Sequence, residues 1–236
     1  MYDIVYAVRD SSPNEELRYS LRSVERNWGP HGKIWFFGGK PTGLEPDEYI
    51  HVTMPLSDKW KNIHRTMRRI CMEDAVTEDF WYFNDDFFVV RATREDMPQQ
   101  VNGELWDAIV EVERTFGCET SWTRQLRVLV DVLGRGGMGQ RNFEVHKPML
   151  INRRRMLAMM DEFPCVWFFR SMYGNYYDIP AENAGDVLVM DNSDISRMLE
   201  MRPVFLSSTE ESFASGGIGR YIRAEFPDAC RQEVDE

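Results

Sequence analysis

Two adjacent carboxylates, Asp85 and Asp86, follow Asn84 directly after a run of four aromatic residues at positions 80–83. Uncompensated charges beside a buried aromatic segment are costly, and they either find a partner or change their protonation. A hard divalent cation would remove that cost, because Mg²⁺ prefers one or two carboxylates together with diphosphate oxygens and water. A polar β-turn is the alternative, since Asn and Asp are favourable turn residues. This segment alone leaves both interpretations open.

Two further side chains could take part in acid–base or phosphate chemistry. His146 is one of only four histidines and lies in an extended segment before Pro148, where a packed or surface role is more common than catalysis. Arg170 follows an apolar run, and an arginine anchored there needs an anionic partner. That partner would be either a protein carboxylate or a substrate phosphate.

Other candidate features are less specific. Arg18 and Arg22 are four residues apart on one face of an expected helix, which is typical of an exposed basic face. The Gly-rich stretch at residues 134–139 lacks the lysine of a Walker loop and follows no clear strand, so it is typical of a surface loop.

The elements that would position these side chains begin with a β-α-β unit. The sequence predicts a strand at residues 4–8, a helix that starts near Ser12 and runs to about Trp28, and a second strand at 34–37. This order implies a parallel sheet with the helix on one face. Asp10 would lie just beyond the first strand.

The rest of the chain continues the alternation of helices and strands. We expect the aromatic run to be a strand, with Asn84-Asp85-Asp86 at its carboxyl end, where ligands bind in open α/β sheets. The other expected elements are strands at 49–54, 187–190 and 204–206 and helices at 58–74, 104–133, 152–163 and 210–226, the last interrupted by Gly216-Gly217.

Length and composition favour one globular domain. The chain has 236 residues, and 43% of them are hydrophobic. Its formal net charge of −11 and its pI near 5.0 argue against a nucleic-acid-binding protein. The four cysteines form no CxxC pair, so we expect reduced thiols rather than a zinc site. No leader peptide and no apolar run of about 20 residues is evident, so a cytoplasmic protein without a membrane span is expected.

Three segments resemble signature blocks of the Stealth family of sugar-phosphate transferases. Residues 14–24 resemble its first block, residues 80–88 its second, and His146-Lys147-Pro148 with Phe169-Arg170 its third. The fourth block of the family carries an Asn-Asp pair, which residues 205–211 lack. Asp10 matches the first-block aspartate in a reduced context. The compact chain is also similar to small glycosyltransferase-like proteins encoded by bacteriophages.

The resemblance implies an α/β, GT-A-like nucleotide-diphosphosugar transferase fold with a mostly parallel central sheet flanked by helices. A single transferase domain would span residues 1–236, with the nucleotide-sugar half at 1–100 and the acceptor half at 101–236. The donor would be an NDP-sugar, with a UDP-sugar favoured, held with Mn²⁺ or Mg²⁺. The acceptor would be a glycan, a lipid-linked intermediate or a protein in a bacterial cell, and the oligomeric state is open.

The resemblance also implies roles for single residues. Asp85 and Asp86 would bind the metal and act in catalysis, His146 would be the general base or bind the acceptor, and Arg170 would clamp phosphate. A second set of residues would bind the donor: Asp10, Arg18, Arg22 and Asn84. Transfer of the sugar and transfer of sugar-1-phosphate both stay open. The rival functions are a degenerate sugar- or nucleotide-binding module and a metal-dependent phosphohydrolase, although no further metal-ligand cluster is evident for the latter.

Overall fold

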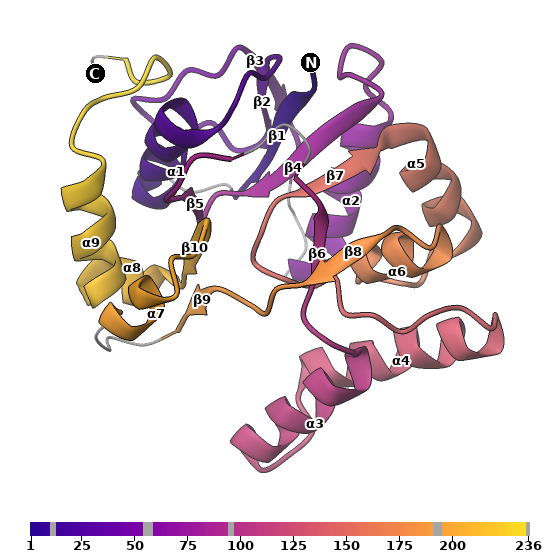
Figure 1. The fold of residues 1–236 in the computed structure, drawn as a ribbon. Coiled ribbons are helices and arrows are strands. Elements are labelled where there is room, and N and C mark those ends of the chain that lie inside the picture. Colours follow the sequence, from indigo (N-terminus) through magenta and orange to yellow (C-terminus); the bar gives the residue numbers. More distant parts are fainter. Residues whose placement is uncertain (10–12, 54–58, 94–96, 191–194, 235–236) are drawn as a thin grey trace.

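The computed structural model describes residues 1–9, 13–53, 59–93, 97–190 and 195–234. Its central sheet has five strands in the order β3-β2-β1-β4-β7. The first four strands are parallel, and β7 is antiparallel to β4 at one edge (Figure 1). These strands are β1 (Asp3–Val8), β2 (Ile34–Gly38), β3 (Glu48–His51), β4 (Asp79–Asn84) and β7 (Met149–Asn152).

The strand order contains a topological switch point between β1 and β4. The chain passes from β1 to β2 on one side, whereas β4 pairs with the opposite edge of β1. In the register of this pair Ala7 lies opposite Asn84, so the two strands end side by side. In open α/β sheets the crevice at such a point, beyond the carboxyl ends of the strands, is where ligands bind.

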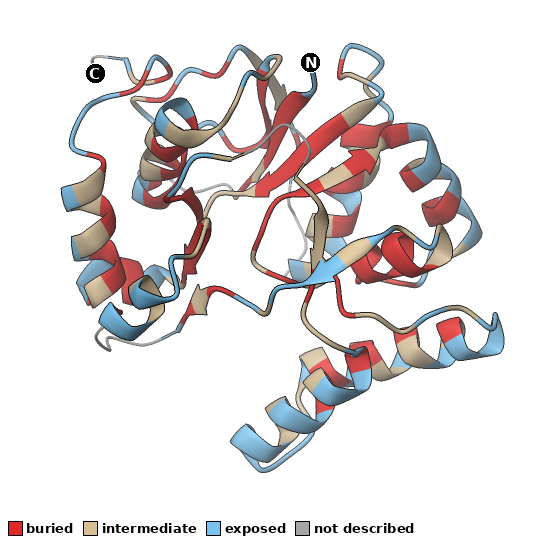
Figure 2. Ribbon diagram, in the orientation of Figure 1, coloured by how far each residue is buried: buried red, intermediate tan, exposed pale blue. Residues whose placement is uncertain are grey.

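Helices cover both faces of the sheet because successive strand side chains point to opposite sides. Ile4 and Tyr6 of β1 pack with Leu17 and Leu21 of α1 (Glu15–Asn27), and Val5 packs into the cluster on the other face. That other face is covered by α2 (Lys59–Cys71), α5 (Arg153–Glu162) and α6 (Phe169–Tyr176). Figure 2 shows the strands as the buried layer between these helices.

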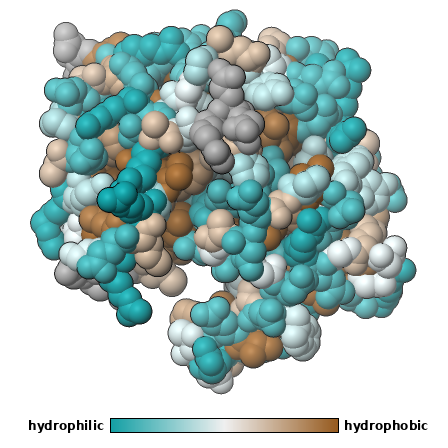
Figure 3. Space-filling model, in the orientation of Figure 1, coloured by the Kyte–Doolittle hydropathy of each residue, from teal (hydrophilic) through white to brown (hydrophobic). Residues whose placement is uncertain are grey.

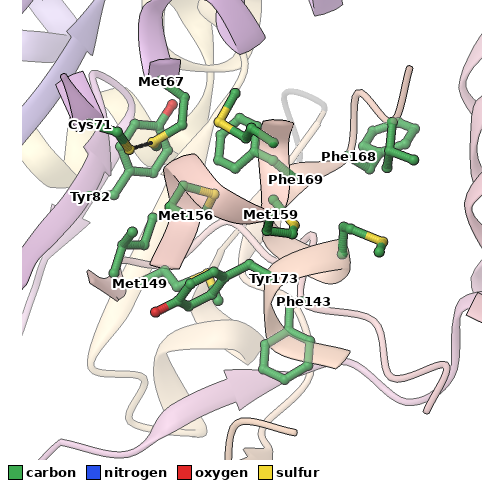
Figure 4. Packing of buried hydrophobic residues seen from close by; sticks show 14 of the residues in the cluster. Met67, Cys71, Tyr82, Phe143, Met149, Met156, Met159, Phe168, Phe169 and Tyr173 are labelled. Carbon is green, nitrogen blue, oxygen red and sulfur yellow. Dashed lines mark hydrogen bonds between the residues drawn. The ribbon is translucent and has the colours of Figure 1, made fainter. Parts of the chain in front are cut away.

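The cluster beneath α2, α5 and α6 is rich in methionine and aromatic side chains. Met67, Met156 and Met159 pack there with Tyr82 and Phe169, as seen in Figure 4. Unbranched methionine side chains fill the irregular space between helices that meet the sheet at different angles. This packing fixes β4 and α6 relative to each other, which matters for the residues at their ends.

A second, smaller sheet follows the central one. Its order is β5-β10-β9, and β5 begins two residues after β4 ends. Its strands are β5 (Phe87–Val89), β9 (Leu188–Val189) and β10 (Phe205–Ser208), and α7 (Ser196–Glu200), α8 (Glu210–Ser215) and α9 (Gly217–Glu225) lie beside it. A further parallel pair joins β6 (Gln99–Val101) to β8 (Ala181–Asn183).

The helix expected at residues 104–133 is instead a hairpin of two helices, α3 (Leu105–Phe116) and α4 (Ser121–Arg135). Gly117 ends α3 in the left-handed conformation at φ 69°, and Thr120 starts α4 with a capping box to Thr123. The hairpin projects from the body of the molecule and carries hydrophobic surface (Figure 3). Trp106 is 48% exposed there.

Most other sequence-based boundaries are close to those observed. The first helix has Asn14 as its N-cap, while the predicted start at Ser12 lies outside the described residues, as do Met54 and Asp58 at the ends of two other elements. The closing helix divides at Gly216 as predicted. Strand β7 and helix α6 were not predicted. Within the described part of the chain, no helix is long and apolar enough to cross a membrane.

Candidate active site at the carboxyl ends of β1 and β4

Asp85 and Asp86 form the two-residue turn that joins β4 to β5. The turn interpretation of this segment is therefore correct for the backbone. Because the turn lies at the switch point between β1 and β4, its side chains also stand where ligands bind in this class of fold. The two carboxylates nevertheless have different surroundings.

The carboxylate of Asp85 is held by two neighbours from the β1–α1 region. Asn14 donates from Nδ2 to Asp85 Oδ2 at 2.7 Å, and its own Oδ1 caps α1 by accepting from the Leu17 N–H. The Arg9 Nε lies 3.6 Å from the same Asp85 oxygen. Burial raises the pKa of Asp85, and the Asn14 hydrogen bond and the Arg9 charge act in the opposite direction.

Arg9 follows the last residue of β1 and connects three carboxylates. Its guanidinium donates to Glu16 of α1 at 2.9 Å and to Glu210 of α8 at 2.8 Å, in addition to its ion pair with Asp85. Glu16 is buried and also accepts a hydrogen bond from Ser208 at 2.9 Å. Burial raises the pKa of Glu16. One arginine therefore joins both sheets at the edge where the turn lies.

Asp86 lacks such partners. Its Oδ1 is buried and accepts no hydrogen bond from the described residues. Burial, followed by the charge of Asp85, raises the pKa of Asp86 to about 7. Buried polar atoms in native proteins are nearly always paired with protein, water or a ligand. An unpaired carboxylate oxygen at a ligand-binding edge therefore points to a cationic or hydrogen-bonding ligand.

His146 lies near Asp86 and is anchored by an aspartate that sequence reasoning did not select. The ring Nδ1 and the backbone N–H of His146 lie 2.8 and 2.9 Å from the two carboxylate oxygens of Asp186. Its ring meets Phe87 edge to face, with centroids 6.4 Å apart. Burial lowers the pKa of His146, but Asp186 and the charge of Asp86 outweigh that effect and raise it overall.

Arg170 is buried on α6 and also lies near Phe87. One of its terminal nitrogens donates to the carbonyl of Lys147, whereas Nε has no hydrogen-bond partner among the described residues. Its guanidinium carbon lies 5.9 Å from the centre of the Phe87 ring. Burial lowers the pKa of Arg170, opposed by the charges of Glu144, Asp186 and Asp86. The positive charge thus lies near the unpaired carboxylate.

Two predicted donor-binding residues, Arg18 and Arg22, contact other parts of the described chain rather than this turn. Asp10 lies outside the described residues. Arg22 donates to both oxygens of Glu233, and Arg18 also lies 3.7 Å from Glu233. These arginines hold the C-terminal segment against α1. Their role in donor binding stays a prediction, whereas Asn84, as the last residue of β4, lies beside the turn.

The residues fit a cation that is shared with a ligand. Within the described ranges, no group of three or more His, Cys, Asp and Glu side chains is arranged to hold a metal ion. Asp85 and Asp86 supply two carboxylates, one with a buried unpaired oxygen. Two carboxylates completed by diphosphate oxygens and water are the usual set for Mg²⁺ at a phosphate site.

Sequence reasoning did not identify three residues of this site: Arg9, Glu16 and Asp186. Arg9 had a usable signal, because it follows a predicted strand and directly precedes Asp10. Glu16 lies in the first turn of the predicted helix, where acidic residues are common, and nothing near Asp186 distinguishes it from the other acidic residues of the chain. Their roles depend on contacts between segments that are far apart in the sequence.

The fold resembles that of a solved sugar transferase. The structure of galactosyltransferase LgtC, determined in complex with donor and acceptor sugar analogs, matches 97% of this chain and 98% of its own chain, with a TM-score of 0.52 and 15% sequence identity. No protein-family model and no curated protein sequence matches the chain. The prediction of an α/β, GT-A-like fold with a mostly parallel central sheet is thereby confirmed. The resemblance to the Stealth family stays a prediction.

Proposed function

We propose that the protein is a metal-dependent glycosyltransferase that moves a sugar from an NDP-sugar to an acceptor hydroxyl. The observation that carries this proposal is the buried, unpaired Oδ1 of Asp86, next to Asp85 at the switch point of the sheet. Likeness in fold to a galactosyltransferase supports transfer of the sugar itself. The Stealth resemblance favours transfer of sugar-1-phosphate, which we keep as the second chemistry.

Asp85 and Asp86 would hold Mn²⁺ or Mg²⁺ together with the donor diphosphate. The bound cation would supply neutralisation of the charge that develops on the leaving diphosphate. Asn14 and Arg9 keep Asp85 in place through contacts at 2.7 and 3.6 Å, so its geometry would be set before the donor arrives. Asn84 would contact the donor, and Asp10, Arg18 and Arg22 remain candidates for donor binding.

His146 and Arg170 would act on the acceptor side of Asp86. His146 would accept the proton of the acceptor hydroxyl, and its partial exposure of 32% leaves it open to a substrate. The buried Arg170, which donates to the Lys147 carbonyl and lies near Phe87, would add positive charge close to the diphosphate. These roles agree with the residues that the sequence selected.

The substrates are proposed only by class. A UDP-sugar is the favoured donor, and a glycan, a lipid-linked intermediate or a protein is the acceptor. We further propose one transferase domain over residues 1–236, with the donor bound by residues 1–100 and the acceptor by residues 101–236, in a protein of bacterial cytoplasm that a phage could encode. A degenerate sugar- or nucleotide-binding module is the main alternative, because residues 205–211 depart from the fourth block of the Stealth family.

Slow hydrolysis of the donor tests the proposal without knowledge of the acceptor. The protein is incubated with a panel of NDP-sugars and Mn²⁺, and released nucleotides are separated by chromatography. Release of NDP supports sugar transfer, and release of NMP supports transfer of sugar-1-phosphate. Donor binding without release would favour the degenerate module, and neither binding nor release across the panel would overturn the proposal.

A pair of variants separates the turn from general effects of charge. Asp85→Ala removes a proposed metal ligand and should abolish donor hydrolysis while the protein stays folded by circular dichroism. Asp107→Asn, on the exposed face of α3, changes the same net charge far from the turn and should leave the rate unchanged. Full activity of Asp85→Ala would refute the metal site.

A further inference from the structure

Asp186 makes three hydrogen bonds at once, and they fix its orientation. Its Oδ1 accepts from the backbone N–H of His146 at 2.9 Å and from its own neighbour, the backbone N–H of Val187, at 2.8 Å. Its Oδ2 faces the Nδ1 of the His146 ring at 2.8 Å. One carboxylate oxygen is therefore committed to the backbone, and the other is committed to the imidazole.

This arrangement determines which ring nitrogen carries the proton. An ionised carboxylate only accepts hydrogen bonds, so Nδ1 must be the donor in the neutral ring. Burial raises the pKa of Asp186, but its hydrogen bonds with His146 and Val187 prevail and lower it overall, which keeps it ionised at neutral pH. The neutral imidazole then has Nε2 free of a proton, and Nε2 is the nitrogen that is able to accept one.

The groups around the ring agree with a role in the active site. Asp86 and Asp186 raise the pKa of His146, and Arg170 lowers it. Burial raises the pKa of the nearby Glu144, and the charge of the imidazole in turn acts to lower it. The side chains of His146 and Asp186 are 32% and 30% exposed, so the pair lines an accessible surface rather than the core. An internal, purely structural pair would not need that access.

We propose that Asp186 is a positioning residue that holds His146 in the Nδ1–H tautomer and so presents Nε2 to the substrate hydroxyl. The inference rests on the proposed function, in which His146 is the base. The hydroxyl proton goes to Nε2, and the hydroxyl oxygen forms the new bond to the anomeric carbon of the sugar. The bond between that carbon and the diphosphate oxygen breaks, and its electron pair leaves with the NDP.

Asp186→Asn is an unusually direct test of this assignment. Because two backbone N–H groups require an acceptor at the Oδ1 position, the amide oxygen takes that place and the amide NH₂ turns toward Nδ1. Nδ1 must then become the acceptor, and the ring proton moves to Nε2. The variant keeps the shape and the backbone contacts but reverses the tautomer.

Nuclear magnetic resonance of ¹⁵N-labelled histidine reads the tautomer whether or not a donor is turned over. The chain has only four histidines, and His146→Gln assigns the signal. We expect Nδ1–H in the native protein, and Nε2–H with a lower pKa in Asp186→Asn. Glu182→Gln, an exposed carboxylate on β8, is the matched control and should change neither. An unchanged tautomer in Asp186→Asn would overturn the proposal.

Donor hydrolysis then connects the tautomer with chemistry. Asp186→Asn should lower kcat by about 10²–10⁴-fold, the usual contribution of a general base, with little change in the KM for the donor. Adding His146→Gln to Asp186→Asn should cause little further loss, because both remove one function. A kcat equal to that of the native protein would also overturn the proposal. If the native protein releases no nucleotide, the proposed function fails, and the tautomer measurement still decides what Asp186 does.

Discussion

Asp85 and Asp86 are neighbours in the chain, yet they belong to two different regions of the molecule. Asp85 faces the β1–α1 side, where Asn14 and Arg9 contact it. Asp86 lies toward the segment around His146 and α6, and its Oδ1 has no partner among the described residues. The first region fixes a carboxylate before any ligand is present, whereas the second leaves one for a ligand to complete.

The difference shows how one turn connects two parts of the chain that are distant in sequence. The partners of Asp85 come from residues 9–14, and the charges near Asp86 come from residues 146 and 170. A carboxylate that the protein already neutralises supplies geometry. A carboxylate with one buried oxygen that lacks a hydrogen-bond partner lowers stability, and groups with such perturbed pKa values cluster at functional sites.

After the loss of activity expected for Asp85→Ala, the largest effect is expected for Asp86→Asn. Donor hydrolysis should fall at least about 100-fold, because several kcal/mol of charge stabilisation accompany a bound cation. The stability of Asp86→Asn, in contrast to its activity, should increase. The pKa of Asp86 is raised to about 7, so the contribution of this group to stability is greatest below the ordinary carboxylate pKa near 4 and is lost as the pH rises through 7.

Urea unfolding at two pH values measures this gain. At pH 4 the variant and the native protein should have similar free energies of unfolding, whereas at pH 8 Asp86→Asn should be more stable by an amount on the order of a few kcal/mol or less. A variant that is less stable than the native protein at pH 8 would show that Asp86 has a partner after all.

A second prediction tests the other side of the turn through Asn14. Asn14→Asp preserves the helix cap, because Asp and Asn cap equally well, but it replaces the donor to Asp85 with a second carboxylate. Loss of a hydrogen bond to a charged group is worth about 1.5–3 kcal/mol, so donor hydrolysis should fall on the order of tenfold or more. The free energy of unfolding from chemical denaturation should not show the loss that removal of the cap would cause.

Asn14→Ala provides the contrast, since it removes the cap and the contact together. It should lower the free energy of unfolding by about 1 kcal/mol for the cap alone. If Asn14→Asp were as active as the native protein, Asp85 would not need its partner, and the distinction between the two carboxylates would disappear.

The fold was more predictable than the site, for physical reasons that particular elements illustrate. Hydrophobic periodicity located β1, α1, β2 and β4 because these elements bury a regular pattern of side chains. The break between α3 and α4 was missed, although Gly117 followed by the capping residue Thr120 is a local signal for it. Strand β7 has only four residues, and its place depends on pairing with β4.

The residues of the candidate site likewise differ in whether local sequence could identify them. Asn84-Asp85-Asp86 could be placed from local sequence, because a turn at the end of a buried strand needs only its neighbours. Asp186 could not, because it meets His146 across 40 residues of chain. Arg22 has the residue type expected of a phosphate ligand, but Glu233 near the other end of the chain engages it. Contacts of this kind are decided by packing, which the sequence does not state locally.

A third, smaller effect concerns the pH dependence of the His146–Asp186 pair. The pKa of His146 is raised, so its contribution to stability is complete below about pH 6.5 and is lost as the pH rises through the folded value. The pKa of Asp186 is lowered, so its contribution is complete above about pH 4 and is lost on acidification. The coupling energy from a double-mutant cycle should therefore peak between about pH 4 and 6.5, at no more than about 1 kcal/mol for a partly exposed pair. A coupling energy that stays unchanged below about pH 4 and above about pH 6.5 would contradict the ion pair.

The smallest effect is expected for Glu210→Gln. The size of this effect tests how far the β1–α1 region that holds Asp85 extends. Glu210 is 78% exposed, and its contact with Arg9 at 2.8 Å is a surface ion pair. Such pairs contribute about 0–1 kcal/mol, and Arg9 keeps Glu16 and Asp85 as partners without it. Both urea unfolding and donor hydrolysis should therefore stay close to native values.

Glu16→Gln is the matched comparison, because it changes a buried partner of the same arginine and should have the greater effect on both measurements. A loss of activity in Glu210→Gln as large as that of Asn14→Asp would mean that α8 helps to hold Asp85, and that the region which fixes this carboxylate spans both sheets.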